Sequence, residues 1–184
     1  MRKGFFVSAA IVLLSGFAST ARADDYNIDP MHGGVTFRVS HLDLSNVYGR
    51  FNTVSGSFTI DGANSSFNMA IKADSVDTGN KGRDDHLRGG DFFNAKQFSQ
   101  ITFKSTAVKP VEGGLEVTGD FTMHGVTKPI TFTLKGGKVA EMKGKRTGYS
   151  TELVLKRSIW GMDKFTQMIG DDVQVAISIE GVSK

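Results

Sequence analysis

The chain contains no cysteine and few histidines, and both deficits exclude chemistry. Without cysteine among its 184 residues, the protein has no disulfide, iron–sulfur cluster, zinc–thiolate site or thiol nucleophile. Packing and sheet hydrogen bonds must therefore provide its stability. The four histidines, His32, His41, His86 and His124, never lie three or four residues apart. Local metal-ligand spacing is thus absent, although residues distant in sequence could still converge, and we expect neither a metal site nor a cofactor.

A long hydrophobic run is also missing. The apolar stretch over residues 5–18 is shorter than the roughly 20 residues that a membrane anchor usually needs. Basic residues precede it, and Ala21-Arg22-Ala23 follows with the small-x-small pattern of a signal peptidase site. We predict a cleaved secretory signal peptide over residues 1–23, followed by one periplasmic domain over residues 24–184. The alternative is a retained N-terminal anchor.

The predicted mature chain has no excess charge of either sign. The leader holds three of the 22 basic residues and no acidic one, so 19 basic residues remain against 19 acidic residues. The basic character of the full sequence therefore belongs to the leader, and nucleic acid is not an expected partner. A mature chain of this length buries one sizeable core in a single domain.

What the chain has in abundance is alternation of apolar and polar residues. Leu115, Val117, Phe121 and Met123 fall on one face of a single extended segment, with polar residues on the other face. The strand predicted over residues 130–135 is expected to end at Gly136-Gly137. Similar alternation, with turn signals between the strands, recurs over residues 35–40, 67–72 and 173–180.

The middle of the chain lacks this alternation. Residues 82–98 are rich in charge and glycine, and they predict one or two short helical turns within a long connection. About eight strands with short links favour an antiparallel meander, either closed into a barrel or packed as a two-sheet sandwich. We expect an all-β, eight-stranded antiparallel barrel, because closure removes exposed edges and lets the C-terminal strand pair with the N-terminal one.

The interior of such a barrel is either filled by side chains or holds one slender ligand, and periodicity does not decide between them. A transmembrane barrel would turn the apolar faces toward lipid, but one Trp and three Tyr are few for its interface girdles. If the interior holds a ligand, strand parity predicts that twelve side chains contact it: Phe37, Val39, Phe58, Phe67, Met69, Ile71, Phe103, Val117, Phe121, Met123, Phe132 and Ile177.

Two polar segments are candidates for chemistry at the barrel rim. Arg83-Asp84-Asp85-His86-Leu87-Arg88 is either an acid–base centre or a capped, salt-bridged turn with Phe92 and Phe93 as a hydrophobic plug. It shows no nucleophile and no orienting third residue, so we predict no catalytic residue. Lys156-Arg157-Ser158-Ile159-Trp160 either clamps a polar head group or covers the barrel end. The predicted head-group contacts are His32, Arg83, His86, Arg157 and Trp160.

A series of landmarks runs through the whole predicted mature chain. They include Tyr26-x-Ile28-Asp29-Pro30-x-His32, Arg83-Asp84-x-His86-Leu87, Asp91-Phe92-Phe93-Asn94, Gly119-x-Phe121-Thr122-x-His124-Gly125-Val126-Thr127-Lys128-Pro129 and Arg157-x-x-x-Gly161-Met162. Together they resemble the YceI family of exported, lipocalin-like barrels, often called polyisoprenoid-binding proteins. Two departures are Gly33, where a serine is usual, and Ser99-Gln100, where a proline is usual.

The resemblance implies a function that the residues alone do not supply. The barrel of that family accepts a long isoprenoid, such as a quinone or polyprenyl lipid, or a fatty chain. Members of the family are sometimes associated with membrane cytochromes of the b561 type. We therefore expect a carrier or storage protein for such a lipid and not an enzyme. An enzyme acting on a lipid head group and a ligand-free structural or stress barrel remain as alternatives. The sequence leaves open whether the chain forms a homodimer.

Overall fold

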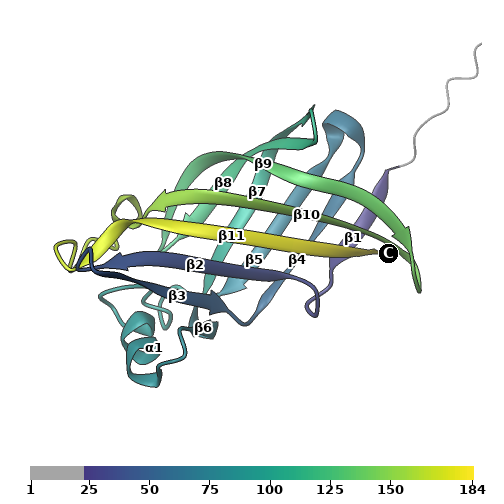
Figure 1. Cartoon of the computed structure of the whole chain (residues 1–184). Helices are drawn as coiled ribbons and strands as arrows, with labels where there is room; N and C mark the ends of the chain where they lie inside the picture. The colour runs from purple at the N-terminus through teal and green to yellow at the C-terminus, as the bar shows by residue number, and fades with distance from the viewer. Residues whose placement is uncertain (1–22) are drawn as a thin grey trace, which may run out of the picture.

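The computed structural model describes residues 23–184 (Figure 1). The predicted signal peptide lies outside these residues except for Ala23, and the first strand begins at Asp24. No helix among the described residues is long and apolar enough to cross a membrane.

Eleven strands and a few short helices make up the described part of the chain. The strands are β1 (Asp24–Ile28), β2 (Gly34–His41), β3 (Ser45–Phe51), β4 (Val54–Ile60), β5 (Ser66–Lys72), β6 (Val76–Asp77), β7 (Gln100–Val111), β8 (Gly114–Met123), β9 (Val126–Glu141), β10 (Lys145–Lys156) and β11 (Ile169–Ser183). The helices are η1 (Gly62–Asn64), η2 (Ala73–Ser75), α1 (Lys81–Arg88) and η3 (Arg157–Trp160).

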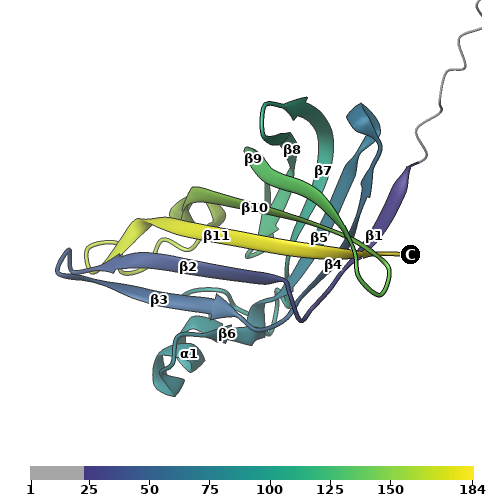
Figure 2. The ribbon, with the colours of Figure 1, turned by 45° about the vertical axis from the view of Figure 1, so that its right-hand side comes forward.

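The eleven strands form a barrel of eight, because three consecutive pairs each act as one bent strand. β1 and β2 both pair with β11, β4 and β3 pair with β1 and β2, and β5 and β6 pair with β4 and β3. The remaining strands follow in chain order, and every pairing is antiparallel. Figure 2 shows the course of the meander, and the pairing of β1 with β11 closes it. The predicted barrel, and the pairing of the C-terminal strand with the N-terminal one, are confirmed.

The predicted helical segment is confirmed as α1, which begins one residue earlier than expected. Asn80 caps it, since its side chain accepts a hydrogen bond from the backbone N–H of Arg83 at 3.0 Å. The Arg88 guanidinium donates to the carbonyl oxygens of Asp74 and Val76 at 2.7 and 2.8 Å. These bonds fasten the helix beneath β6, at the lower end of the barrel in Figure 1.

The prediction that Gly136-Gly137 ends a strand was wrong, because β9 continues through both glycines to Glu141. The two residues have φ values of 130° and 91°, which side chains rarely adopt. A Cβ atom on Gly136 would lie 2.4 Å from the carbonyl oxygen of Gly148 on β10. The glycines therefore bend β9 where the β9–β10 register shifts, instead of ending it.

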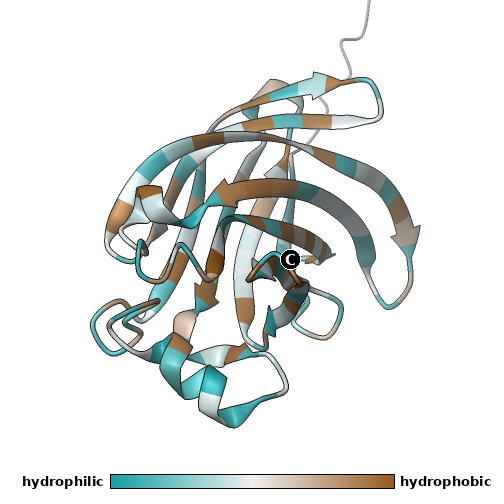
Figure 3. Ribbon diagram, turned by 60° about the vertical axis from the view of Figure 1, so that its left-hand side comes forward, coloured by the Kyte–Doolittle hydropathy of each residue, from teal (hydrophilic) through white to brown (hydrophobic). Residues whose placement is uncertain are grey.

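Aromatic rings fill one end of the barrel. Tyr26 stacks on Phe58 at 5.0 Å between ring centroids, and Phe58 stacks on Phe67 at 5.4 Å. Tyr149 meets both phenylalanines edge-on, and burial raises the pKa of its hydroxyl. Gly181 leaves room for this aromatic stack, since a Cβ there would lie 2.4 Å from the Phe58 ring. Hydrophobic and hydrophilic residues alternate along the strands around it (Figure 3).

Candidate functional site

A cavity of about 130 Å³ lies inside the barrel, on the side away from the aromatic stack. Since about 10–15 Å³ of such volume holds one water, the cavity has room for about ten waters or a short stretch of hydrocarbon. Its lining comes from every barrel wall and from the segment after α1. Among the described residues that line it, Thr102 and Arg157 alone are not apolar.

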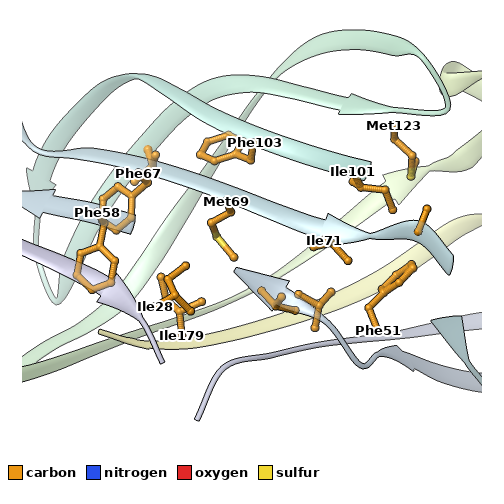
Figure 4. Close-up of a cluster of buried hydrophobic side chains, with 14 of the residues drawn as sticks. Ile28, Phe51, Phe58, Phe67, Met69, Ile71, Ile101, Phe103, Met123 and Ile179 are labelled. Carbon is orange, nitrogen blue, oxygen red and sulfur yellow. The ribbon is translucent and has the colours of Figure 1, made fainter. Parts of the chain in front are cut away.

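Nine of the twelve side chains predicted to contact a ligand line this cavity. They are Phe37, Val39, Met69, Ile71, Phe103, Phe121, Met123, Phe132 and Ile177. The other three, Phe58, Phe67 and Val117, also face inward, but they are buried in the packed core and do not line the cavity. Figure 4 shows Phe58 and Phe67 beside Ile28 and Ile179, separated from Ile101 and Met123 at the other end. Strand parity predicts the inward face, but not the position along the barrel axis.

Several lining residues were absent from the predicted set. Val35, Val173 and Val175 share the parity of the predicted residues on their strands, so the same signal could have found them. Leu153 and Leu155 also line the cavity, and they lie on β10, for which the sequence pattern gave no inward face. Beyond the strands, the lining includes Leu87, Phe92, Phe93 and Met162.

Phe92 and Phe93 form the expected hydrophobic plug over the end of the barrel. Phe93 packs edge-on against Phe51 at 5.4 Å, and Phe92 stacks on Phe165 at 6.0 Å between centroids. His86 meets the Phe92 ring edge-on at 5.0 Å. The segment after α1 and the loop before β11 therefore meet across the plug.

Arg157 is the one charged side chain that lines the cavity within the described part of the chain. It is 4% exposed, and its guanidinium donates to the carbonyl oxygens of Gly170, Met162 and Ile169 at 3.0, 2.5 and 2.9 Å. Burial lowers its pKa. Because three of its five N–H donors are used on backbone carbonyls, Arg157 fastens η3 to the start of β11.

Trp160 covers the barrel end and does not line the cavity. Its side chain is 1% exposed and meets Phe121 edge-on at 5.3 Å. Its carbonyl oxygen lies 3.2 Å from Nδ1 of His124, whose Nε2 atom, like Nε1 of Trp160, is buried without a hydrogen-bond partner among the described residues. Trp160 therefore lies over the end of the barrel, where the second interpretation of residues 156–160 places it, and not against a head group in the cavity.

His86 and Arg83 lie on α1 outside the cavity lining. Nε2 of His86 is 3.3 Å from Oδ2 of Asp91, and both side chains are about half exposed. Arg83 donates to the backbone oxygen and the hydroxyl of Thr78 at 2.9 and 2.7 Å. The buried carboxylate of Asp84 accepts from the N–H and the hydroxyl of Thr78 at 2.9 and 2.6 Å. This geometry is that of a capped, hydrogen-bonded turn.

His32 lies between β1 and β2, away from the cavity lining. Its Nδ1 atom is 3.0 Å from Oδ2 of Asp29, and Arg146 donates to Asp29 at 2.8 Å and to Glu180 at 2.5 Å. The Arg146 guanidinium, followed by His32, holds the pKa of Asp29 well below its usual range. Asp29, His32 and Glu180 have the spacing of metal ligands, but the guanidinium already occupies both carboxylates.

Comparison with known proteins places this geometry in a family context. The YceI-like domain model matches residues 26–181. Protein YceI of Escherichia coli O17:K52:H18 is 39% identical over 174 residues, which cover 91% of each chain. The crystal structure of Burkholderia cenocepacia BcnA is similar, with a TM-score of 0.74 and 28% identity over 83% of this chain and 98% of that one.

A further solved structure shares the fold alone. It is a polyisoprenoid binding domain from Saccharophagus degradans implicated in plant cell wall breakdown. The TM-score is 0.69, with 19% identity over 86% of this chain and 98% of that one.

Proposed function

The chain belongs to the YceI-like domain family, and from this we propose that it is a periplasmic carrier or storage protein for a long isoprenoid or fatty-chain lipid. The apolar cavity inside the barrel carries the proposal. A cavity of this kind, with few polar groups, is what a small-molecule site for an apolar ligand requires. The polyisoprenoid-binding neighbour of the same fold supports the choice of ligand class.

The energetics favour a long chain over a short one. Burying one CH₂ group contributes about 0.8 kcal/mol, so one five-carbon unit contributes about 4 kcal/mol. Association costs roughly 4–15 kcal/mol before any net affinity remains. A stable complex therefore needs more than one such unit inside the cavity, and because the cavity holds a short stretch of hydrocarbon, a long chain would extend beyond it. The flexible side chains of Met69, Met123 and Met162 in the lining suit a ligand of irregular shape.

The lining favours binding over catalysis. Within the described part of the chain, no histidine, carboxylate, serine or lysine lines the cavity, so a bound chain meets no general base there. The Arg157 side chain is held by three backbone carbonyls. An enzyme acting on a head group would need its groups outside this cavity, and turnover of a candidate lipid would reveal it.

Binding is tested with the mature protein purified from its periplasm. Native mass spectrometry and lipid extraction should show a co-purified apolar chain. The delipidated protein should then bind a dansyl-labelled fatty acid, and farnesol should displace it. If the folded, delipidated protein binds neither compound, the carrier proposal fails and a filled barrel replaces it.

Export is tested separately. The proposed cleavage after Ala23 would leave β1 intact, because that strand begins at Asp24. Intact-mass measurement of the periplasmic protein should give a chain starting at Asp24. A mature form that still contains Phe5 would contradict the proposal.

A further inference from the structure

The barrel wall has a seam between β9 and β10 where the two strands are not paired. Their ladder runs from Glu141 and Lys145 to Lys135 and Ser150, and it stops there. Beyond this point, residues 126–134 of β9 pair with β8 alone, whereas residues 151–156 of β10 pair with β11 alone. Figure 2 shows the two strands diverging.

The seam follows from the bend in β9. Gly136 and Gly137 turn the first half of the strand away from β10 just where the last paired residues lie. Continued register would bring Thr133 opposite Glu152 and Phe132 opposite Leu153, but neither pair forms. The facing edges of β9 and β10 are therefore unpaired beyond Lys135 and Ser150, although natural proteins usually cover such strand edges.

A groove of about 830 Å³ on the outside of the barrel crosses the seam. Polar side chains line it from both strands, including Thr131 and Thr133 of β9 and Glu152 of β10. Phe132 and Leu153, one from each edge of the seam, line both the groove and the internal cavity. The site therefore changes from apolar inside to polar outside across one gap, as a lipid with a polar end would require.

Both ends of the barrel are covered by residues that the structure describes, and a second outer groove, which shares Phe37, Leu153 and Val175 with the cavity, lies over strands that are paired. The aromatic stack around Phe58 fills one end of the barrel. Trp160 and Phe92 cover the other end, and Arg157 fastens that cover through three hydrogen bonds. β6 pairs with β3 alone among the described strands, and α1 is fastened beside it through Arg88.

We propose that the seam between β9 and β10 is a lateral portal, through which the apolar chain of the lipid passes between Phe132 and Leu153 while its polar end stays in the outer groove. This inference rests on the proposed function. The mixed signs of Lys135 and Glu152 beside the groove hydroxyls suit a neutral, hydrogen-bonding head group such as an alcohol or a quinone. The small cavity volume agrees with a ligand that is partly outside.

Cross-linking tests the portal, and the chain's lack of cysteine makes each engineered pair unique. Thr133→Cys with Glu152→Cys places one thiol on each edge of the seam. Bismaleimides of increasing length are applied until intact mass shows complete linkage, because a disulfide would need Cα atoms within about 7 Å. The reference is the same protein with both thiols capped by N-ethylmaleimide. The matched control is Lys104→Cys with Asp120→Cys, two exposed residues that are paired across β7 and β8 and lie outside both the groove and the cavity lining.

The readout is the rate at which delipidated protein takes up the dansyl-labelled fatty acid. We expect linkage across the seam to slow uptake at least about tenfold relative to the capped protein, and linkage of the control pair to change it less than about twofold. Unchanged uptake after complete linkage of the seam would overturn the portal and leave the carrier proposal standing. If neither wild-type nor capped protein binds the probe, the proposed function itself fails.

A second pair guards against a folding defect of the first. If capped Thr133→Cys with Glu152→Cys does not bind the probe as wild type does, Thr131→Cys with Val154→Cys repeats the test one step further along the seam. All four side chains are exposed. The uptake rates of the linked and the capped second pair are then compared. Slower uptake after linkage supports the portal, and unchanged uptake overturns it.

Discussion

Replacing Phe58 and Phe132 one at a time should distinguish the packed end of the barrel, which contributes stability, from the cavity, which contributes ligand binding. Phe58 is 2% exposed and contacts three aromatic rings, with centroids 5.0, 5.4 and 5.9 Å away. Truncating a packed phenylalanine costs about 3–5 kcal/mol, so Phe58→Ala should approach the upper value. Phe132 contacts Phe103 at 5.1 Å and already borders the cavity. With fewer neighbours to lose, Phe132→Ala should cost about 2 kcal/mol.

The two variants should also differ, in the opposite order, in their affinity for a lipid. Phe132→Ala removes part of the cavity wall, which should weaken binding of the dansyl-labelled fatty acid by about 5–30-fold, equivalent to about 1–2 kcal/mol. Phe58→Ala should leave the dissociation constant within about twofold, since Phe58 does not line the cavity. Urea unfolding, followed by the fluorescence of the single tryptophan, gives stability, and titration at low urea gives affinity.

A milder variant keeps this test valid if Phe58→Ala does not fold. Phe58→Leu keeps most of the apolar volume and should lose about 1–2 kcal/mol without affecting affinity. The reasoning is refuted if a folded Phe58 variant weakens lipid binding as much as Phe132→Ala does. It is equally refuted if Phe132→Ala binds lipid like the wild type.

Three further changes test other parts of the structure. His86→Ala should leave fatty-acid affinity within about twofold, because His86 lies outside the cavity lining; a titration showing a tenfold loss would place it in the site. Gly136→Ala should destabilise the protein by more than about 1 kcal/mol in urea, since its Cβ would meet β10, whereas Gly34→Ala, where nothing lies within 4 Å, should not. Asp29 has its pKa lowered in the folded protein by Arg146, so its carboxylate stabilises the fold above its ordinary pKa of about 4, and that contribution is lost as the pH falls below it. Urea unfolding at several pH values should therefore show that stability falls less steeply toward acid pH for Asp29→Asn than for the wild type. Identical pH profiles of stability would contradict this.

The strands and their inner faces could be predicted from the sequence, because burial of one sheet face places apolar residues at every second position. Phe103, Phe121 and Phe132 were therefore placed correctly on the inner face. This alternation is the same at every position along the barrel axis. It could not tell that Phe58 and Phe67 meet the ring of Tyr149 from β10, a strand that pairs with neither of theirs.

The bend in β9 was missed for a related reason. Two adjacent glycines usually mark a turn, and the sequence alone does not show whether a neighbouring strand continues beyond them. Only the partner explains the outcome, because the carbonyl of Gly148 lies where a side chain on Gly136 would be. Likewise, the carbonyl oxygens that bind Arg157 lie up to 13 residues away, so its role beside Trp160 was left open between two interpretations.

The position of β11 in the sheet has a consequence for how the protein acquires its structure. This strand pairs with β10 on one side and with both β1 and β2 on the other, yet it is the last strand of the described chain. A chain that crosses a membrane with its N-terminus first would present β1 and β2 with an unpaired edge until the final segment emerged. Such edges invite pairing with other chains, and barrels closed by contacts distant in sequence fold slowly. Under the proposed export, the chain should therefore be most prone to aggregation before residues 169–183 are available, and an early chaperone contact would fall on the edge that β11 later covers.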